Sequence, residues 1–338
     1  SMPGGLIYVN VIAAMLFGAI SGSAVAAASA IGGILGPPME KEKYSKEFGA
    51  AINVSASTTG LIIPPSNVLI VYSLASGGVS IASLFLAGYI PGILMGLALM
   101  LVAAVWIKKK KYPPGEKTSA KKIATTFLDA LPSLLLLVVV IGGIVSGIFT
   151  ATEASGIAVL YTLILAIIYR EINLNKLHKI FLSSVVTTSI VLLLIATSMG
   201  MSWVMSFENI PQTVSDALLG LSDNKYVILI IINLLLLFVG TFMDMTPAIL
   251  IFTPIFLPIM KSLGVDPVHF GMIMVMNLCV GLCTPPVGSV LFIGVGVAKT
   301  TIQKVMKPLL PLYIAMAIIL LLVTYLPQIS LWLPGLFE

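Results

Sequence analysis

Two double-proline motifs interrupt long apolar stretches of the chain. The first is GLIIPP at residues 60–65 and the second is GLCTPP at residues 281–286. Because proline has no N–H to donate and its ring clashes with the preceding turn, each pair predicts a break in a helix. The backbone carbonyls freed at a break are oxygen ligands. Neutral oxygens with few carboxylates suit a hard monovalent cation, chiefly sodium.

Hydroxyl side chains stand near both motifs, and one carboxylate accompanies the second. Asp244 lies in a short polar turn between two apolar segments. A carboxylate at membrane depth is costly and by default functional; a structural acid that caps neighbouring amides is the alternative. The hydroxyls are those of Ser21, Ser23, Ser55, Ser57, Thr58, Thr59 and Ser66 in the first half, and of Thr241, Thr246, Thr284 and Ser289 in the second.

A shift of 221 residues relates the two halves of the chain. It superposes Ser23 on Asp244, Gly60 on Gly281, and the first proline pair on the second. This predicts an internal repeat with one sodium site in each copy, in which the two glycines let the chain turn without steric penalty. The predicted ligands are Ser21, Ser23, Gly60, Ile63 and Pro65, mirrored by Phe242, Asp244, Gly281, Thr284 and Pro286, with a backbone oxygen where the side chain has none.

The ends of the predicted helices favour an anionic substrate. Helices that begin after the polar turns and after the prolines direct partial positive charge toward one central space, which suits a carboxylate. Asn67, just past the first break, can donate and accept hydrogen bonds, although a packing role is equally open. The predicted substrate contacts are Gly22, Ser57, Thr58, Ser66, Asn67 and Thr246.

The composition is that of an all-α integral membrane protein. Of 338 residues, 59% are hydrophobic and 9% are charged, whereas soluble domains carry about 25% charged residues. The net charge of +5 comes from loop lysines, so nucleic acid is not an expected partner. We expect no enzyme, because the chain has no constellation of histidine, cysteine and acid, and we expect Cys279 and Cys283 to be packing residues.

Two pairs of apolar segments, each joined by a short polar turn, fall short of the roughly 20 residues that a helix needs to cross the hydrocarbon. Segments 6–20 and 24–38 form one pair, and 226–242 and 247–260 form the other, so we predict two re-entrant hairpins. Segments 48–74 and 268–299 follow them as discontinuous helices. The remaining predicted helices are 82–107, 131–148, 155–169, 181–205 and 307–326, and the predicted domains are a first repeat at 1–107, scaffold helices at 108–225 and a second repeat at 226–338.

Basic residues set the expected orientation. If the lysine-rich loop 108–122 is cytoplasmic, the lysines of 41–46, 176–179 and 299–307 are cytoplasmic too, and the acidic segment 208–223 is outside. Three crossings separate the repeats, so the second is inverted against the first.

Three further titratable residues have no clear chemistry. Glu153 is either an acid of an outer loop or a buried brace, and a structural role is favoured. His178 and His269 are expected in loops without a second metal ligand nearby.

Five ordered motifs over essentially the whole chain resemble the large membrane subunit of the tripartite ATP-independent periplasmic (TRAP) transporters. They are FGAISGSAVAAASAIGG, TTGLIIPPSN, GIFTATEASGIAVLY, GTFMDMTPAILIFTPIFLPI and GLCTPPVGSVLFIGVGVA. Family members carry further helices before the first hairpin, so the chain is expected to be a portion of a longer protein or a separated piece.

The resemblance implies an elevator-type, sodium-driven importer in the bacterial inner membrane. Such a subunit works with a smaller Q-type membrane subunit and receives an organic anion from a periplasmic solute-binding protein. The family's sodium ligands would map onto Ser21, Ser23, Gly60, Ile63, Pro65 and Asp244. The first tip and break favour sialic acid over C4-dicarboxylates as the substrate. The alternatives are an ion channel built on inverted hairpins and another inverted-repeat transporter of ions or carboxylates.

Overall fold

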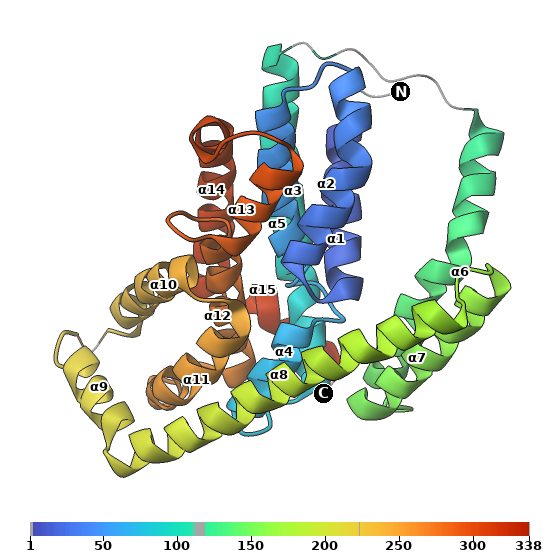
Figure 1. Cartoon of the computed structure of the whole chain (residues 1–338). Helices are drawn as coiled ribbons and strands as arrows, with labels where there is room; N and C mark the ends of the chain where they lie inside the picture. The colour runs from blue at the N-terminus through green and yellow to red at the C-terminus, as the bar shows by residue number, and fades with distance from the viewer. Residues whose placement is uncertain (1–2, 111, 113–118, 223, 338) are drawn as a thin grey trace. The chain divides into compact units, whose positions relative to one another are not determined.

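The computed structural model describes residues 3–110, 112, 119–222 and 224–337, and every regular element in them is helical (Figure 1). Of the residues that the orientation argument uses, Lys111, Lys117 and Asp223 lie outside the described part. The helices are α1 (Gly5–Ser21), α2 (Ala24–Lys41), α3 (Lys46–Thr59), α4 (Asn67–Ala75), α5 (Ile81–Lys110), α6 (Ala120–Val145), α7 (Ala151–Ile168), α8 (Leu174–Phe207), α9 (Ile210–Leu219), α10 (Lys225–Phe242), α11 (Met245–Ser262), α12 (Pro267–Leu282), α13 (Ser289–Val297), α14 (Ile302–Tyr325), α15 (Gln328–Leu331) and the 3-10 helix η1 (Pro334–Leu336).

Seven of the described helices are long and apolar enough to cross a membrane, which confirms the prediction of a multi-pass membrane protein. They are α5, α6, α7, α8, α10, α11 and α14. Helices α10 and α11 each have 18 residues, which at 1.5 Å per residue rise about 27 Å, close to the 30 Å hydrocarbon core. Their length therefore suits a full crossing as well as a hairpin, and re-entry stays a prediction.

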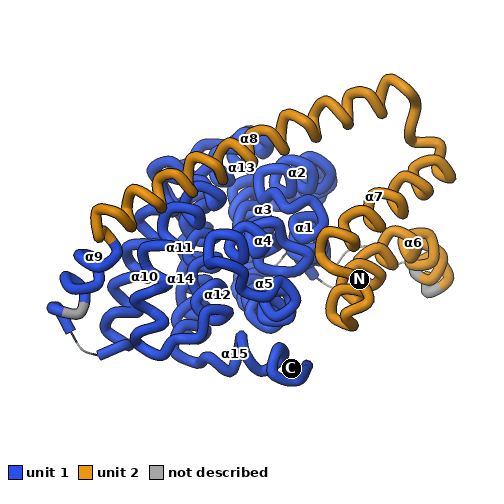
Figure 2. Tube along the Cα trace, turned by 90° about the horizontal axis from the view of Figure 1, so that it is seen from below, with its two compact units in different colours: residues 1–117, 211–338 blue, residues 118–210 orange. Residues whose placement is uncertain are grey.

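The chain divides into two compact units, residues 1–117 with 211–338 and residues 118–210 (Figure 2). The second unit holds the antiparallel pair α6 and α7, in which the Tyr161 hydroxyl donates to the Pro132 carbonyl at 2.7 Å. The first unit holds both predicted repeats. The predicted domain boundaries at 107/108 and 225/226 separate the repeats, whereas the two compact units are defined by their internal contacts. The predicted boundaries therefore stay a prediction.

Helices α3 and α12, the first parts of the two broken helices, form the core of the first unit. Residues 50–59 of α3 and 269–282 of α12 are buried. Helices α1 and α2 pack on α3, and α10 and α11 pack on α12 in the same order. In addition, α2 contacts α13 while α11 contacts α4. Each hairpin thus packs against the second part of the other repeat's broken helix, which is the arrangement expected of a two-fold repeat.

Several elements differ in detail from the sequence expectations. The segment 208–223, for which no helix was predicted, contains α9, whose second residue is Pro211, a residue suited to the first turn of a helix. The two histidines lie in helices rather than loops, His178 in α8 and His269 in α12. Helix α8 starts before its apolar run because the Asn173 side chain caps it.

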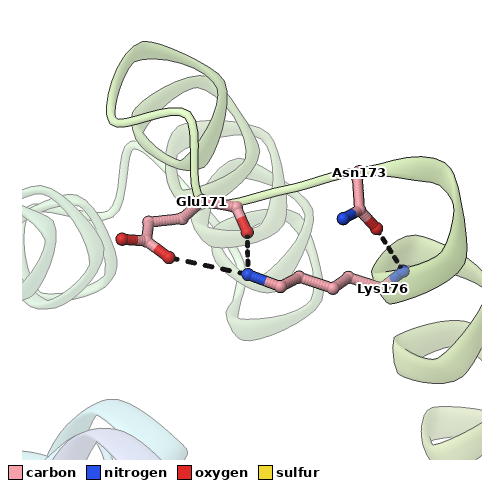
Figure 3. A network of polar contacts seen from close by, with 3 residues as sticks. All are labelled: Glu171, Asn173 and Lys176. Atoms are coloured by element: carbon pink, nitrogen blue, oxygen red, sulfur yellow. Dashed lines mark hydrogen bonds and ion pairs between the residues drawn. The ribbon is translucent and has the colours of Figure 1, made fainter.

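The turn between α7 and α8 has its own polar network (Figure 3). The Asn173 side chain accepts a hydrogen bond from the Lys176 backbone N–H at 2.8 Å. The Lys176 ammonium donates to the Glu171 carbonyl at 2.7 Å and lies 3.7 Å from its carboxylate. All three side chains are exposed, which fits a turn at an aqueous membrane face.

A capping box begins helix α7. The Glu153 carboxylate accepts from the Thr150 backbone N–H at 2.8 Å, and the Glu153 backbone N–H donates to the Thr150 hydroxyl at 3.3 Å. Because the box satisfies two of the orphan donors at the helix start, Glu153 has the structural role that we expected, although its side chain is exposed rather than buried.

The orientation predicts which exposed sites react from which side of the membrane. Single cysteines introduced by Lys109→Cys, at the end of α5, and by Gln212→Cys, in α9, should react with an impermeant thiol reagent from opposite sides in oriented vesicles. Native Cys279 and Cys283 are buried and should stay unlabelled, which provides the background. Labelling of both introduced cysteines from the same side would refute the inverted orientation.

Candidate functional site

The two hairpin tips occupy equivalent places but differ in their caps. In the first, Gly22 has a left-handed backbone (φ 63°) and the Ser23 hydroxyl accepts from the Ala26 N–H at 3.2 Å. In the second, Asp244 is the N-cap residue of α11, but its carboxylate caps no backbone N–H and the residue is exposed. The alternative interpretation of Asp244 as an amide-capping acid is therefore wrong.

Both broken helices unwind where the prolines predict. The first break runs from Gly60 to Ser66, and the Ser66 hydroxyl donates a hydrogen bond to the Leu61 carbonyl at 2.5 Å. The second break runs over 283–288, where the Tyr313 hydroxyl donates to the Cys283 carbonyl. The Pro64–Pro65 and Pro285–Pro286 peptide bonds are both cis.

Each hairpin tip lies against the break of its own repeat. A Cβ atom built on Gly22 would lie 3.0 Å from the Asn67 side-chain Cγ, so the structure brings these two predicted substrate contacts together. In the second repeat the Gly288 N–H, at the position equivalent to Asn67, donates to the Thr241 carbonyl at 3.2 Å. The same junction is thus made by a side chain in one repeat and by backbone in the other.

Gly60 and Gly281 serve close helix packing rather than a turn, so the steric expectation for them was wrong. Gly60 has helical backbone angles, and neither glycine has a positive φ. A Cβ built on Gly60 would lie 2.7 Å from the Gly18 Cα, and one on Gly281 would lie 2.5 Å from the Gly240 Cα. Gly18 and Gly240 were missed from the sequence, although a shift of 222 residues relates them.

The two repeats meet at a pair of equivalent residues. Thr58 and Cys279 are related by the 221-residue shift, and the Cys279 thiol donates to the Thr58 carbonyl at 3.2 Å. The Thr58 hydroxyl also lies 3.3 Å from the Cys283 sulfur. Contact between equivalent positions is what a pseudo-two-fold axis requires. Both cysteines are free and buried here, which confirms them as packing residues.

The predicted site residues range from fully buried to exposed. Ser57 and Thr58 are fully buried and donate to the carbonyls of Asn53 (2.6 Å) and Ser55 (2.9 Å). Their role in substrate binding stays a prediction. Gly60, Gly281 and Ser66 are buried; Gly22, Ser23, Ile63, Pro65, Thr246 and Thr284 are half-buried; and Ser21, Asn67, Phe242, Asp244 and Pro286 are exposed.

The sequence is similar to a family of membrane transport components. Residues 1–329 match the family described as "Tripartite ATP-independent periplasmic transporter, DctM component". Among curated relatives, Uncharacterized protein YgiK of Salmonella typhimurium is 60% identical over 99% of this chain and 77% of its own length. The C4-dicarboxylate TRAP transporter large permease protein DctM of Pseudomonas aeruginosa is 40% identical over 98% of this chain and 78% of its own. The Sialic acid TRAP transporter large permease protein SiaM of Vibrio cholerae is 38% identical over 99% and 78%.

The glycine contacts predict a position-specific loss of stability. Gly281→Ala should lower the thermal unfolding temperature in detergent by the equivalent of about 1–3 kcal/mol, because the new methyl meets backbone rather than a flexible side chain. Gly296→Ala, in α13 with open space around its Cα, should not destabilise the protein. Equal melting temperatures for Gly281→Ala and the unmodified chain would contradict the close crossing.

Proposed function

The chain belongs to the DctM component family of the tripartite ATP-independent periplasmic transporters, and we propose that it couples sodium entry to uptake of an organic acid anion. Membership of this family makes it a multi-pass membrane component of a solute uptake system and not an enzyme. The observation that carries the proposal is the pairing of a hairpin tip with a helix break in each repeat.

Sodium coupling is supported by the oxygen atoms that gather at each tip and break. The breaks at 60–66 and 283–288 leave backbone carbonyls outside regular helix, and oxygen ligands of low charge suit a monovalent cation. Asp244 adds one carboxylate that caps no helix. We propose one sodium site in each repeat, made by the ligand sets that the 221-residue shift relates.

An anionic substrate is supported by uncapped helix starts. Helices α4 and α13 begin at the breaks, and α11 begins at the second tip. In none of the three does a side chain of the N-cap residue accept a hydrogen bond from a backbone N–H of the first turn. The first N–H groups of a helix have no helical partner and carry partial positive charge. A carboxylate that accepts from them is the ligand such ends favour.

The substrate is proposed as a class. The relatives named for C4-dicarboxylates and for sialic acid are almost equally similar to this chain, at 40% and 38% identity. The sequence-based preference for sialic acid therefore has no support from overall similarity, and both remain candidates within the class of organic acid anions.

The proposed setting is the bacterial inner membrane, with two partners. Transporters of this family are tripartite, which supports a small Q-type membrane subunit and a periplasmic solute-binding protein beside this chain. We propose an elevator movement in which the hairpins and broken helices carry the substrate together. The ion-channel alternative differs in one measurable property, because a channel passes ions without substrate.

Uptake by the assembled complex should depend on a sodium gradient and not on ATP. In proteoliposomes that contain both membrane subunits, with the binding protein outside, labelled organic anion should accumulate only when sodium is directed inward, and the rate should saturate with substrate. Potassium in place of sodium is the control. Accumulation without a sodium gradient would refute the coupling, and sodium flux without substrate would favour a channel.

The two tips should respond unequally to mutation. Asp244→Asn should raise the sodium concentration for half-maximal uptake by roughly tenfold or more, since a full charge near a cation is worth several kcal/mol at an effective dielectric constant of 20. Ser23→Ala should raise it less, because it removes one neutral oxygen among several.

The same two variants should rank in the opposite order in thermal stability, with Ser23→Ala the more destabilised. Ser23 caps α2, so Ser23→Ala should cost about 1 kcal/mol of stability, whereas Asp244→Asn removes no cap. If Asp244→Asn is expressed normally and its sodium dependence is unchanged, the carboxylate is not a sodium ligand and the proposed second site is refuted.

A further inference from the structure

The helices that follow the two broken helices, α5 and α14, are related by the same 221-residue shift as the breaks. The shift pairs identical buried residues, Met95 with Met316 and Leu99 with Leu320. In the same register, α5 has Gly92 where α14 has Tyr313. A glycine and a tyrosine thus stand at equivalent places, and each contacts the break of its own repeat.

In the first repeat, the break packs directly on the backbone of α5. A Cβ atom built on Gly92 would overlap the Ile63 side chain, and one built on Gly88 would overlap the Ile62 carbonyl oxygen. Both glycines are buried. Close packing against helix backbone therefore holds the first break beside Ile63, one of its predicted sodium ligands.

In the second repeat, a hydroxyl takes the place of that packing. The counterpart of Ile63 is Thr284, whose side chain is smaller. The Tyr313 hydroxyl donates to the Cys283 carbonyl, and the Thr284 side chain lies close to the same hydroxyl. Tyr313 thus fixes the backbone directly before Thr284, a predicted sodium ligand.

The carbonyl that Tyr313 engages lies just past the end of α12, outside regular helix. A carbonyl without a donor is costly at membrane depth, so without the phenol hydroxyl the break would turn toward another donor. A cation binds well only if its oxygen ligands are already in the binding arrangement. When that arrangement is only partly populated, the apparent dissociation constant rises by the reciprocal of the populated fraction.

We propose that Tyr313 is a positioning residue for the sodium site of the second repeat, acting through the Cys283 carbonyl and the adjacent Thr284. The inference rests on the proposed function, because it concerns one of the two sodium sites proposed there. The tyrosine does not bind the ion; it holds the break in the arrangement that binds the ion. The first repeat reaches the same end by packing Ile63 on Gly92.

The test compares Tyr313→Phe with Tyr325→Phe in uptake by the complete complex. Both changes remove one phenol hydroxyl from α14, but the Tyr325 hydroxyl donates to the Tyr226 carbonyl at 3.3 Å and not to a break. Tyr313→Phe should raise the sodium concentration for half-maximal uptake by about three- to tenfold, the range that loss of one net hydrogen bond gives. Tyr325→Phe should leave it unchanged.

Two further readouts separate positioning from a general loss of structure. At saturating sodium, Tyr313→Phe should keep the maximum rate and the half-saturating substrate concentration of the unmodified complex. In the Asp244→Asn background it should raise the sodium requirement less, because both residues serve one site. A full effect in that background would place the action of Tyr313 elsewhere and overturn the proposal.

Sodium binding can also be followed without transport. Sodium chloride should raise the melting temperature of the full chain in detergent in a saturable way, with potassium chloride as the control, and half-saturation should need more sodium in Tyr313→Phe. An unchanged sodium dependence in Tyr313→Phe, or a lower maximum rate alone, would overturn the inference while the proposed function stands. If the unmodified complex needs no sodium, the proposed function fails and the inference fails with it.

Discussion

Backbone amides and carbonyls cannot be left unpaired in hydrocarbon, and this constraint governs the arrangement of the first unit. Each broken helix leaves such groups exposed at its proline pair. The structure shelters them with neighbouring donors and acceptors, such as the Ser66 hydroxyl on Leu61 and the Tyr313 hydroxyl on Cys283. The glycine crossings at Gly60 and Gly281 bring a hairpin close enough to cover each break. Burial of α3 and α12 at the centre follows from the same need.

Local chemistry made much of this fold predictable. Proline pairs end helices through their own covalent structure, so the breaks and the starts of α4 and α13 fall where the sequence indicates. Features that depend on tertiary contact were not predictable in the same way. The partner of Gly60 is 42 residues away, at Gly18.

The repeats share a scaffold but differ in chemistry at equivalent places. The Ser23 hydroxyl caps α2, whereas the Asp244 carboxylate accepts no hydrogen bond from the first turn of α11. Asn67 meets the first tip with a side chain, and its counterpart Gly288 meets the second with an N–H. The two tips therefore differ in charge, a difference that the two-fold relation between the repeats alone does not supply.

The exchange of contacts between the repeats constrains how the chain is made. Helix α2 packs on α13, and α4 packs on α11, so neither repeat completes its packing from its own sequence. During synthesis α2 leaves the ribosome roughly 250 residues before α13, which at about 5–20 residues per second is a delay of roughly 10–50 s. The first hairpin must persist in the membrane through that interval with one face uncovered. Its stability as an isolated element, and the lipid or insertion machinery that covers that face meanwhile, are therefore determinants of the yield of folded protein.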